Sequence, residues 1–120
     1  MRILVVEDDF IIASALECRL ADAGFTVVGV AASGAEAMAI AECAAPDLAI
    51  MDVRLSGGRD GIETAIELAS RLGVRSIFVT AHGDAATRAR ARRARPLGWL
   101  EKPYAPDTLI GLILAAFETA

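Results

Sequence analysis

The sequence predicts a doubly wound α/β fold, in which helices cover both faces of a parallel sheet. Two observations point to this class. Short apolar runs alternate with segments of helical periodicity, and this strand–helix order recurs five times along the 120 residues. Apolar runs without polar alternation are typical of strands that are buried on both faces. The alternation contains no linker or repeat, so we expect a single domain over residues 1–120.

The first strand is expected at residues 3–6, because an apolar run ends there in a series of acidic residues. Residues 10–23 follow with helical periodicity, and Gly24 suits the end of that helix. The helix would carry its apolar side chains on one side; these are Ile11, Ile12, Ala15, Leu16 and Leu20. A second strand is expected at residues 26–30.

The middle of the chain adds two further strand–helix pairs. Ser33 and Glu36 have the spacing of a capping box, which predicts a helix that runs to about residue 44, before Pro46. The third strand, residues 48–51, ends at Asp52. A loop then leads to a helix at residues 61–72, which Gly73 ends.

The last part of the chain adds the remaining elements. The fourth strand, residues 76–79, ends at Thr80, and Asp84 can cap a helix from residue 85 to about residue 94. The fifth strand, residues 97–100, leads into Lys102. Pro106 suits the first turn of the last helix, expected at residues 107–119.

Composition excludes several classes of protein. A hydrophobic content of 55% with 23% charged residues excludes disorder as the main state. The net charge of −4 argues against a general nucleic-acid binder. No apolar run reaches the roughly 18 residues of a membrane span, and no signal peptide is recognisable. We therefore expect a cytoplasmic protein with no membrane partner, in which Cys18 and Cys43 are reduced thiols.

Polar residues follow four of the predicted strands, and the carboxyl ends of parallel strands meet in one crevice. These residues are Glu7, Asp8, Asp52, Thr80 and Lys102. Three carboxylates that converge repel one another, so a cation or protons must intervene, and an oxygen-rich site suits Mg²⁺ or Mn²⁺. A hydroxyl and an ammonium would add donors for an anion. Together these groups predict phosphoryl transfer, in which a carboxylate can become an aspartyl phosphate.

Four motifs carry a resemblance to a known family: ILVVEDD, DLAIMDVRL, FVTA and LEKPY. In this order and spacing, the chain resembles a response-regulator receiver domain of bacterial two-component signalling. The resemblance covers essentially the whole chain and implies a flavodoxin-like (βα)5 fold with strand order 2-1-3-4-5. The long loop after Asp52, with RSIFVTAH and PLGWLEKPY, is similar to alphaproteobacterial receivers that are paired with HWE-type histidine kinases.

The resemblance implies a role for each site residue. Asp52 matches the phosphoacceptor, and Glu7, Asp8 and Asp52 match the acids that hold Mg²⁺, Glu7 directly or through water. The backbone carbonyl of Arg54 matches a further metal ligand. Thr80 and Lys102 match the residues that bind the phosphoryl oxygens, and Lys102–Pro103 matches a cis peptide bond. Asp9 matches no ligand and is expected to cap the first helix.

Other positions are implied to act in switching and tuning. Thr80 and Trp99 match the switch pair of the family; the alternative for Trp99 is a ring that packs in one fixed position. Ala81 matches a small position that leaves the phosphoryl pocket open, and Arg54 and His82 match positions beside the phosphoryl group that affect access of water. For His82 the alternative is an ordinary loop residue, and a second phosphoacceptor is a weaker one. The glycine pair in residues 56–59 lacks the rest of a phosphate-binding loop.

The resemblance also implies partners. A histidine kinase or phosphotransfer protein would supply the phosphoryl group, and the fourth helix, fifth strand and fifth helix would bind an unidentified downstream protein. Five arginines crowd the fourth helix, as a solvated basic face or as a docking surface for an acidic partner: Arg88, Arg90, Arg92, Arg93 and Arg95. The last helix has more apolar residues than one packed stripe uses, which suggests a homodimer or partner docking.

Two alternatives from other classes stay open. One is a docking module that never carries phosphate. The other is an aspartate-based phosphatase, which would need a cap over its site, and no segment of the chain suits that role. A receiver modifies itself and does not turn over a substrate, so we do not expect an enzyme in the usual sense. The chain is expected to be either a stand-alone regulator or a receiver from a larger protein.

Overall fold

The structure, a computed structural model, describes residues 1–55, 60–81 and 83–118. Within these residues, five parallel strands form one sheet in the order β2-β1-β3-β4-β5. The strands are β1 (Arg2–Val6), β2 (Thr26–Ala31), β3 (Leu48–Asp52), β4 (Arg75–Thr80) and β5 (Gly98–Glu101). The predicted strand order is confirmed, and each strand lies within one residue of its predicted ends or adds one residue.

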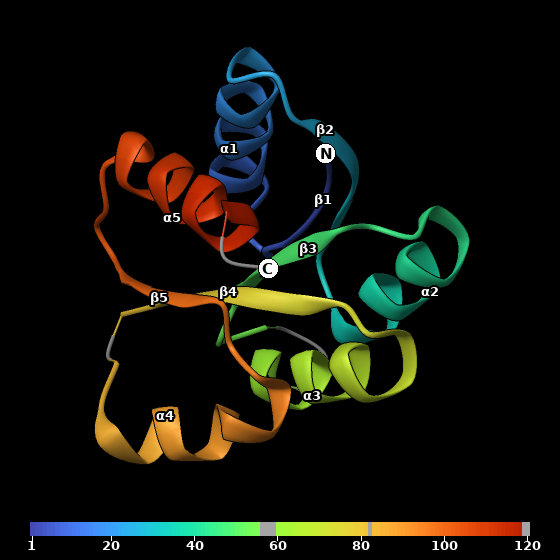
Figure 1. Ribbon diagram of the computed structural model, residues 1–120, viewed down its shortest axis with the longest axis vertical. Helices are drawn as coiled ribbons and strands as arrows, with labels where there is room; N and C mark the ends of the chain where they lie inside the picture. Colours follow the sequence, from blue (N-terminus) through green and yellow to red (C-terminus); the bar gives the residue numbers. More distant parts are fainter. Residues whose placement is uncertain (56–59, 82, 119–120) are drawn as a thin grey trace.

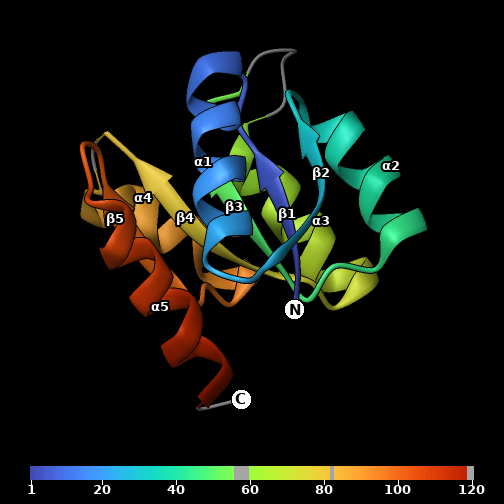
Figure 2. The same cartoon turned by 90° about the horizontal axis from the view of Figure 1, so that it is seen from above.

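Helices cover both faces of the sheet, as the sequence predicts. They are α1 (Phe10–Asp22), α2 (Gly34–Ala44), α3 (Gly61–Leu72), α4 (Ala85–Arg90), the 3-10 helix η1 (Ala91–Ala94) and α5 (Pro106–Glu118). Figures 1 and 2 show α1 and α5 on one face and α2, α3 and α4 on the other. No helix of the described residues is long and apolar enough to cross a membrane.

The core lies on both sides of the sheet because side chains alternate along each strand. In β1, Leu4 and Val6 pack with residues of α2, α3 and η1, whereas Ile3 and Val5 pack with residues of α1 and α5. All four side chains are fully buried. This explains why the strands read as continuous apolar runs, and it fixes the register that brings their carboxyl ends to one edge.

Helix starts follow the predicted caps. The carboxylate of Asp9 accepts hydrogen bonds from the backbone N–H groups of Ile11 (3.0 Å) and Ile12 (3.2 Å). The Ser33 hydroxyl accepts one from Glu36 N, and Asp84 accepts one from Thr87 N. Each cap satisfies backbone donors that the first turn leaves without a helical partner. The predicted capping role of Asp9 is therefore confirmed.

The apolar side predicted for α1 is only partly the packed one. Leu16 and Leu20 are buried, but Ile11 is 79% exposed and Ile12 is 42% exposed. Ala13, which the prediction left out, is buried instead. Ile12 shares a side with Leu16, one turn closer to the start of the helix, whereas Ile11 lies about 100° further around the axis. The first turn of α1 therefore presents apolar side chains to solvent.

The helical segment predicted at residues 85–94 has these bounds in the structure, but it is not a single α-helix. It splits into α4 and η1, and Arg95 then adopts a left-handed φ of 50°. Ala91 and Ala94, three residues apart, are both buried, which suits the three residues per turn of a 3-10 helix. Pro96 disfavours helical geometry at Arg95, and Leu97 N must donate to Ser76 O to begin the return to the sheet.

Candidate functional site

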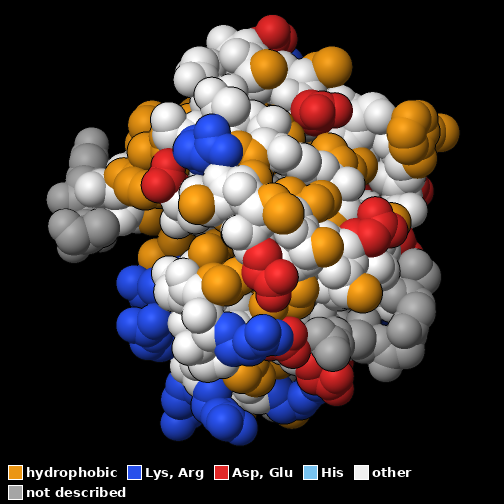
Figure 3. Space-filling model, turned by 90° about the vertical axis from the view of Figure 1, so that its right-hand side faces the viewer, with side chains coloured by type: hydrophobic (Ala, Val, Ile, Leu, Met, Phe, Trp, Pro, Cys, Tyr) orange, Lys and Arg blue, Asp and Glu red, His pale blue; other side chains and the backbone are white. Residues whose placement is uncertain are grey.

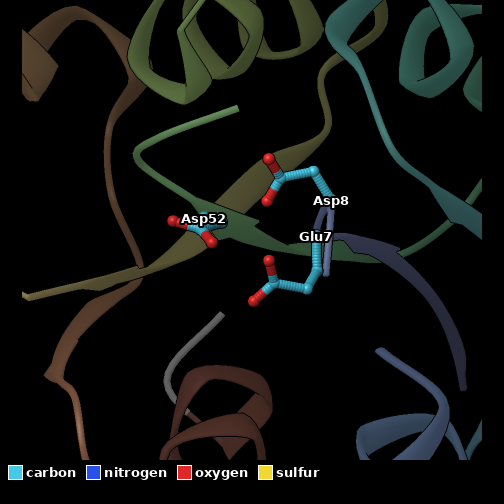
Figure 4. Close-up of side chains that lie close together, drawn as sticks. All are labelled: Glu7, Asp8 and Asp52. Atoms are coloured by element: carbon cyan, nitrogen blue, oxygen red, sulfur yellow. The ribbon is translucent and has the colours of Figure 1, made fainter. Parts of the chain in front are cut away.

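The site lies where the strand order reverses, at the carboxyl ends of β1 and β3. Glu7 and Asp8 directly follow β1, and Asp52 is the last residue of β3. Their side chains point toward one another, and one carboxylate oxygen from each lies within 4.8 Å of the others (Figure 4). The predicted convergence of these acids is therefore present.

Asp52 is nearly buried, and both of its carboxylate oxygens accept hydrogen bonds. Oδ1 accepts from the backbone N–H of Arg54 at 3.0 Å, and Oδ2 accepts from Nζ of Lys102 at 3.0 Å. These two bonds hold the carboxylate in one orientation at the end of the strand. Such a fixed, charged oxygen beside an ammonium is suited to nucleophilic attack on an anionic phosphorus centre.

Lys102 joins the two strands that carry the acids. Its Nζ lies 3.0 Å from Asp52 Oδ2 and 3.4 Å from Glu7 Oε1. Its backbone N–H donates to Thr80 O, and the predicted cis peptide bond to Pro103 is present. Burial lowers the pKa of Lys102, but the hydrogen bond and charge of Asp52, together with Glu7, raise it by more. The ammonium is therefore held in its charged form.

Glu7 shows that the site has an excess of negative charge. Burial and the neighbouring Asp52 raise the pKa of Glu7 to about 7, although the backbone N–H of Asp9 and the charge of Lys102 act against this. Among the described residues, Lys102 is the only cation that an ion pair links to this acidic cluster. Three carboxylates and one ammonium leave the balance negative, so the donor set fits a divalent cation with oxygen ligands.

The acids line an open pocket of about 290 Å³ together with most of the other predicted site residues. Its lining residues are Glu7, Asp8, Asp9, Ile12, Asp52, Arg54, Thr80, Ala81 and Lys102. Thr80 is nearly buried at the end of β4, and Ala81 is exposed beside it. His82 and the glycine pair of residues 56–59 lie outside the described residues. The pocket gives a small anion access to Asp52 from solvent.

Trp99 lies away from this pocket, on β5. Its ring stacks on Phe78 of β4, with centroids 4.7 Å apart and planes 21° from parallel. The guanidinium carbon of Arg88 lies 5.1 Å from the centre of the Trp99 ring. The ring is half-buried and packs between an aromatic ring and a cation. This arrangement is the packed position that we weighed for Trp99; whether the ring also moves stays a prediction.

Sequence reasoning missed Gly61 as a site residue. A Cβ atom at Gly61 would lie 1.8 Å from the backbone oxygen of Asp52, closer than any real contact. The N–H of Gly61 also donates to Val53 O at 2.8 Å. Only glycine permits α3 to begin this close to the end of β3. The sequence signal was a glycine directly after the helix cap Asp60, which we interpreted only as a helix start.

Known proteins share this fold and sequence pattern. The family model for the response regulator receiver domain matches residues 3–114. The transcriptional regulatory protein PdtaR of Mycobacterium tuberculosis is 38% identical over 93% of this chain and 54% of its own length. The phyllosphere-induced regulator PhyR of Methylorubrum extorquens is 32% identical over 95% of this chain and 42% of its own length. The chain thus spans about half the length of these relatives.

Solved structures agree with this relationship. The signal receiver domain of a modulated diguanylate cyclase from Desulfovibrio desulfuricans has a TM-score of 0.90 at 40% identity, covering 98% of this chain and 94% of that one. A CheY-like receiver domain protein from Methanospirillum hungatei has a TM-score of 0.89 at 26% identity, with the same coverage. Receiver domains of response regulators act in signalling and are not turnover enzymes. With the match over residues 3–114, these relatives show that the chain belongs to the response regulator receiver domain family.

Proposed function

We propose that Asp52 is the phosphoryl acceptor of this receiver domain and that its modification is the signal in a two-component pathway. The observation that carries this proposal is the arrangement around Asp52. One oxygen accepts a backbone N–H, the other faces Lys102, and Glu7 and Asp8 lie beside it in an open pocket. A carboxylate with a purely structural role would not need two further acids within 4.8 Å.

Glu7, Asp8, Asp52 and the backbone carbonyl of Arg54 would hold Mg²⁺, with Mn²⁺ as a substitute. When bound, this cation supplies positive charge to the oxygens of the transferred group. The negative balance of the three acids and Lys102 supports the assignment. The carbonyl of Arg54 belongs to a residue whose N–H already bonds Asp52, so that backbone lies at the pocket.

In the reaction, an oxygen of Asp52 attacks the phosphorus atom of a phosphohistidine on the donor. The new O–P bond forms as the N–P bond breaks, and the donor imidazole leaves and takes up a proton. Lys102 then exchanges its contact with Asp52 for one with a phosphoryl oxygen, and Thr80 binds another. Ala81 leaves the pocket open, and Arg54 and His82 affect how fast water hydrolyses the acyl phosphate. The chain would thus promote its own phosphorylation and its slow loss.

The donor is a histidine kinase or a phosphotransfer protein. The first turn of α1 supports a docking area for it beside the pocket. Phe10 and Ile11 are about four-fifths exposed, and Ile11 and Ile12 line an apolar groove with Tyr104 and Pro106. Exposed apolar side chains of this size next to a reactive carboxylate suit a protein surface better than a small molecule.

The unidentified downstream protein would bind to the surface formed by α4, β5 and α5. Thr80 and Trp99 are the proposed switch residues, since the new phosphoryl group would draw Thr80 toward the pocket and change the space behind it. Leu114, half exposed on α5, supports a homodimer contact or partner docking there. The cytoplasmic location expected from the sequence and the pairing with an HWE-type kinase stay predictions.

Incubation with acetyl phosphate and Mg²⁺, followed by intact-protein mass spectrometry, tests the acceptor. We expect one phosphoryl group on the wild-type chain and none on Asp52→Asn. The matched control is Asp22→Asn, an exposed acid at the end of α1, which should be modified like the wild type. Chelation of the metal should prevent modification. A chain that gains no phosphoryl group and releases no phosphate would be a docking module. One that releases phosphate rapidly and repeatedly, with no phosphoryl group accumulating on Asp52, would be a phosphatase.

A further inference from the structure

Positive charge is concentrated in one short segment of this acidic chain. Residues 88–95 contain five arginines and no acidic residue, whereas the whole chain has a net charge of −4. The remainder of the chain therefore sums to −9. In Figure 3 the blue side chains gather at the lower end of the molecule, where Figure 1 places α4. The net charge of −4 therefore conceals a strongly basic segment within an otherwise acidic chain.

The local fold keeps most of these arginines in solvent. Ala91 and Ala94 turn inward and are fully buried, so the residues between and beside them face outward. Arg90 is exposed as well, but its guanidinium pairs with Asp60 at the start of α3. We call the other four, all exposed, the arginine surface: Arg88, Arg92, Arg93 and Arg95.

The charge of the arginine surface is largely not neutralised within the protein. Within the part of the chain that the structure describes, the guanidinium groups of Arg92 and Arg93 make no hydrogen bond or ion pair. Arginines of a merely solvated face are usually interspersed with acids that offset them. Here the nearest acid in sequence, Asp84, lies four residues before Arg88 and caps α4. A neighbouring anion would gain from all four charges together.

We propose that the arginine surface binds an acidic segment of a partner protein. The inference rests on the proposed function in that it names the chemistry of the partner at the output face. Residues 88–95 extend only about 12 Å, which matches roughly three or four phosphates of a nucleic-acid strand and falls short of the six to ten contacts of many DNA binders. The charge of −9 elsewhere would repel a longer polyanion. The half-buried ring of Trp99, beneath Arg88, offers an apolar contact that suits a protein.

Arg88 connects this surface to the edge of the sheet that carries the site. Its guanidinium lies over Trp99, and its Nε donates to Gly83 O at 3.2 Å. Gly83 N in turn donates to Glu101 of β5. An acidic side chain that draws Arg88 away would change the surroundings of the Trp99 ring. Trp99 is the only tryptophan, so its fluorescence reports on this surface.

The test uses a fluorescein-labelled peptide of Glu, Asp and Leu, with fluorescence anisotropy at low salt. We expect saturable binding that Arg92→Gln/Arg93→Gln weakens roughly tenfold. The matched control, Arg19→Gln/Arg71→Gln, removes the same charge from exposed positions on α1 and α3 and should change the affinity less than about twofold. Tryptophan fluorescence should change as the unlabelled peptide binds.

Several results would overturn the proposal. These are equal weakening by both double variants, no effect of Arg92→Gln/Arg93→Gln, or no saturation up to about 1 mM peptide. A single-stranded RNA of the same length that binds more tightly through the same arginines would assign the surface to nucleic acid. Each preparation is also phosphorylated with acetyl phosphate. If the chain is phosphorylated but does not bind the peptide, only this inference is contradicted. If it binds the peptide but is not phosphorylated, only the proposed function is contradicted.

Discussion

The acidic cluster and the arginine surface place similar numbers of charges in opposite surroundings. At the acidic cluster, Glu7 and Asp52 are nearly buried, and each contacts Lys102. On the arginine surface, the side chains are exposed and repel one another only weakly through water. Burial and the neighbouring Asp52 raise the pKa of Glu7 to about 7. Reactivity in this protein therefore depends on where charges are buried, and recognition depends on where they are not.

The largest expected effect comes from removing the cation of the acidic cluster. Lys102→Met keeps a side chain of similar length but removes the charge that faces Asp52 and, after transfer, a phosphoryl oxygen. We expect the rate of phosphorylation by acetyl phosphate to fall by roughly two to three orders of magnitude. Arg92→Met, the same type of change on the arginine surface, should leave the rate unchanged. A Lys102→Met rate within about threefold of the wild type would contradict the assigned role.

The second effect tests the close contact beneath the acidic cluster. Gly61→Ala places a methyl group against the Asp52 carbonyl, which is backbone and cannot swing away as a side chain can. The end of β3 and the start of α3 must separate, and we expect a loss of about 2–3 kcal/mol in the free energy of unfolding. Phosphorylation should slow as well. The control Gly111→Ala, in an exposed turn of α5 with open space around it, should not destabilise the protein. Equal urea midpoints for the two variants would refute the contact.

The third effect is a dependence of folding stability on pH, which we expect in the metal-free protein. The pKa of Glu7 is higher in the folded state than the usual 4.5, so folding favours its protonated form. This contribution to stability is complete below pH 4.5 and is lost as the pH rises through about 7. With chelator present, we expect a loss on the order of 2 kcal/mol between pH 5 and pH 8, allowing for solvent screening.

Urea unfolding of Glu7→Gln and of the control Glu36→Gln, an exposed residue of α2, checks this origin. Glu7→Gln should make the free energy of unfolding nearly independent of pH between pH 5 and pH 8, whereas Glu36→Gln should leave the pH dependence as in the wild type. Added Mg²⁺ should also flatten the wild-type profile, because a bound cation favours the charged carboxylate. A Glu7→Gln profile as steep as that of the wild type would show that another group causes the dependence.

The sequence predicted the sheet and the meeting of Glu7, Asp8, Asp52 and Lys102 because both follow from general rules. Strands buried on both faces must be apolar throughout, and their carboxyl ends meet where the strand order reverses. The exposure of Ile11 did not follow, because periodicity gives the side of a helix but not how far its first turn extends along the sheet. The close approach of Gly61 to Asp52 and the position of Arg88 over Trp99 depend on distances between elements, which no local pattern records.

The smallest expected effect concerns Arg90, the arginine of the segment that is already paired. Burial raises the pKa of Asp60, but the hydrogen bond from Arg90 and the backbone N–H of Glu63 lower it by more. A carboxyl group with a lowered folded pKa contributes stability above its unfolded pKa, and this is lost as the pH falls through the folded value.

Arg90→Gln should therefore lower the urea midpoint slightly at pH 7 and leave it unchanged under strongly acidic conditions, where Asp60 is protonated in both proteins. Arg92→Gln should have no effect on the midpoint at either pH. Because Asp60 caps α3 directly before Gly61, Arg90→Gln should also slow phosphorylation slightly, without weakening acidic-peptide binding as much as Arg92→Gln/Arg93→Gln does. If Arg90→Gln leaves stability unchanged at pH 7 and weakens peptide binding equally, Arg90 belongs with the arginine surface, and its contact with Asp60 does not stabilise the start of α3.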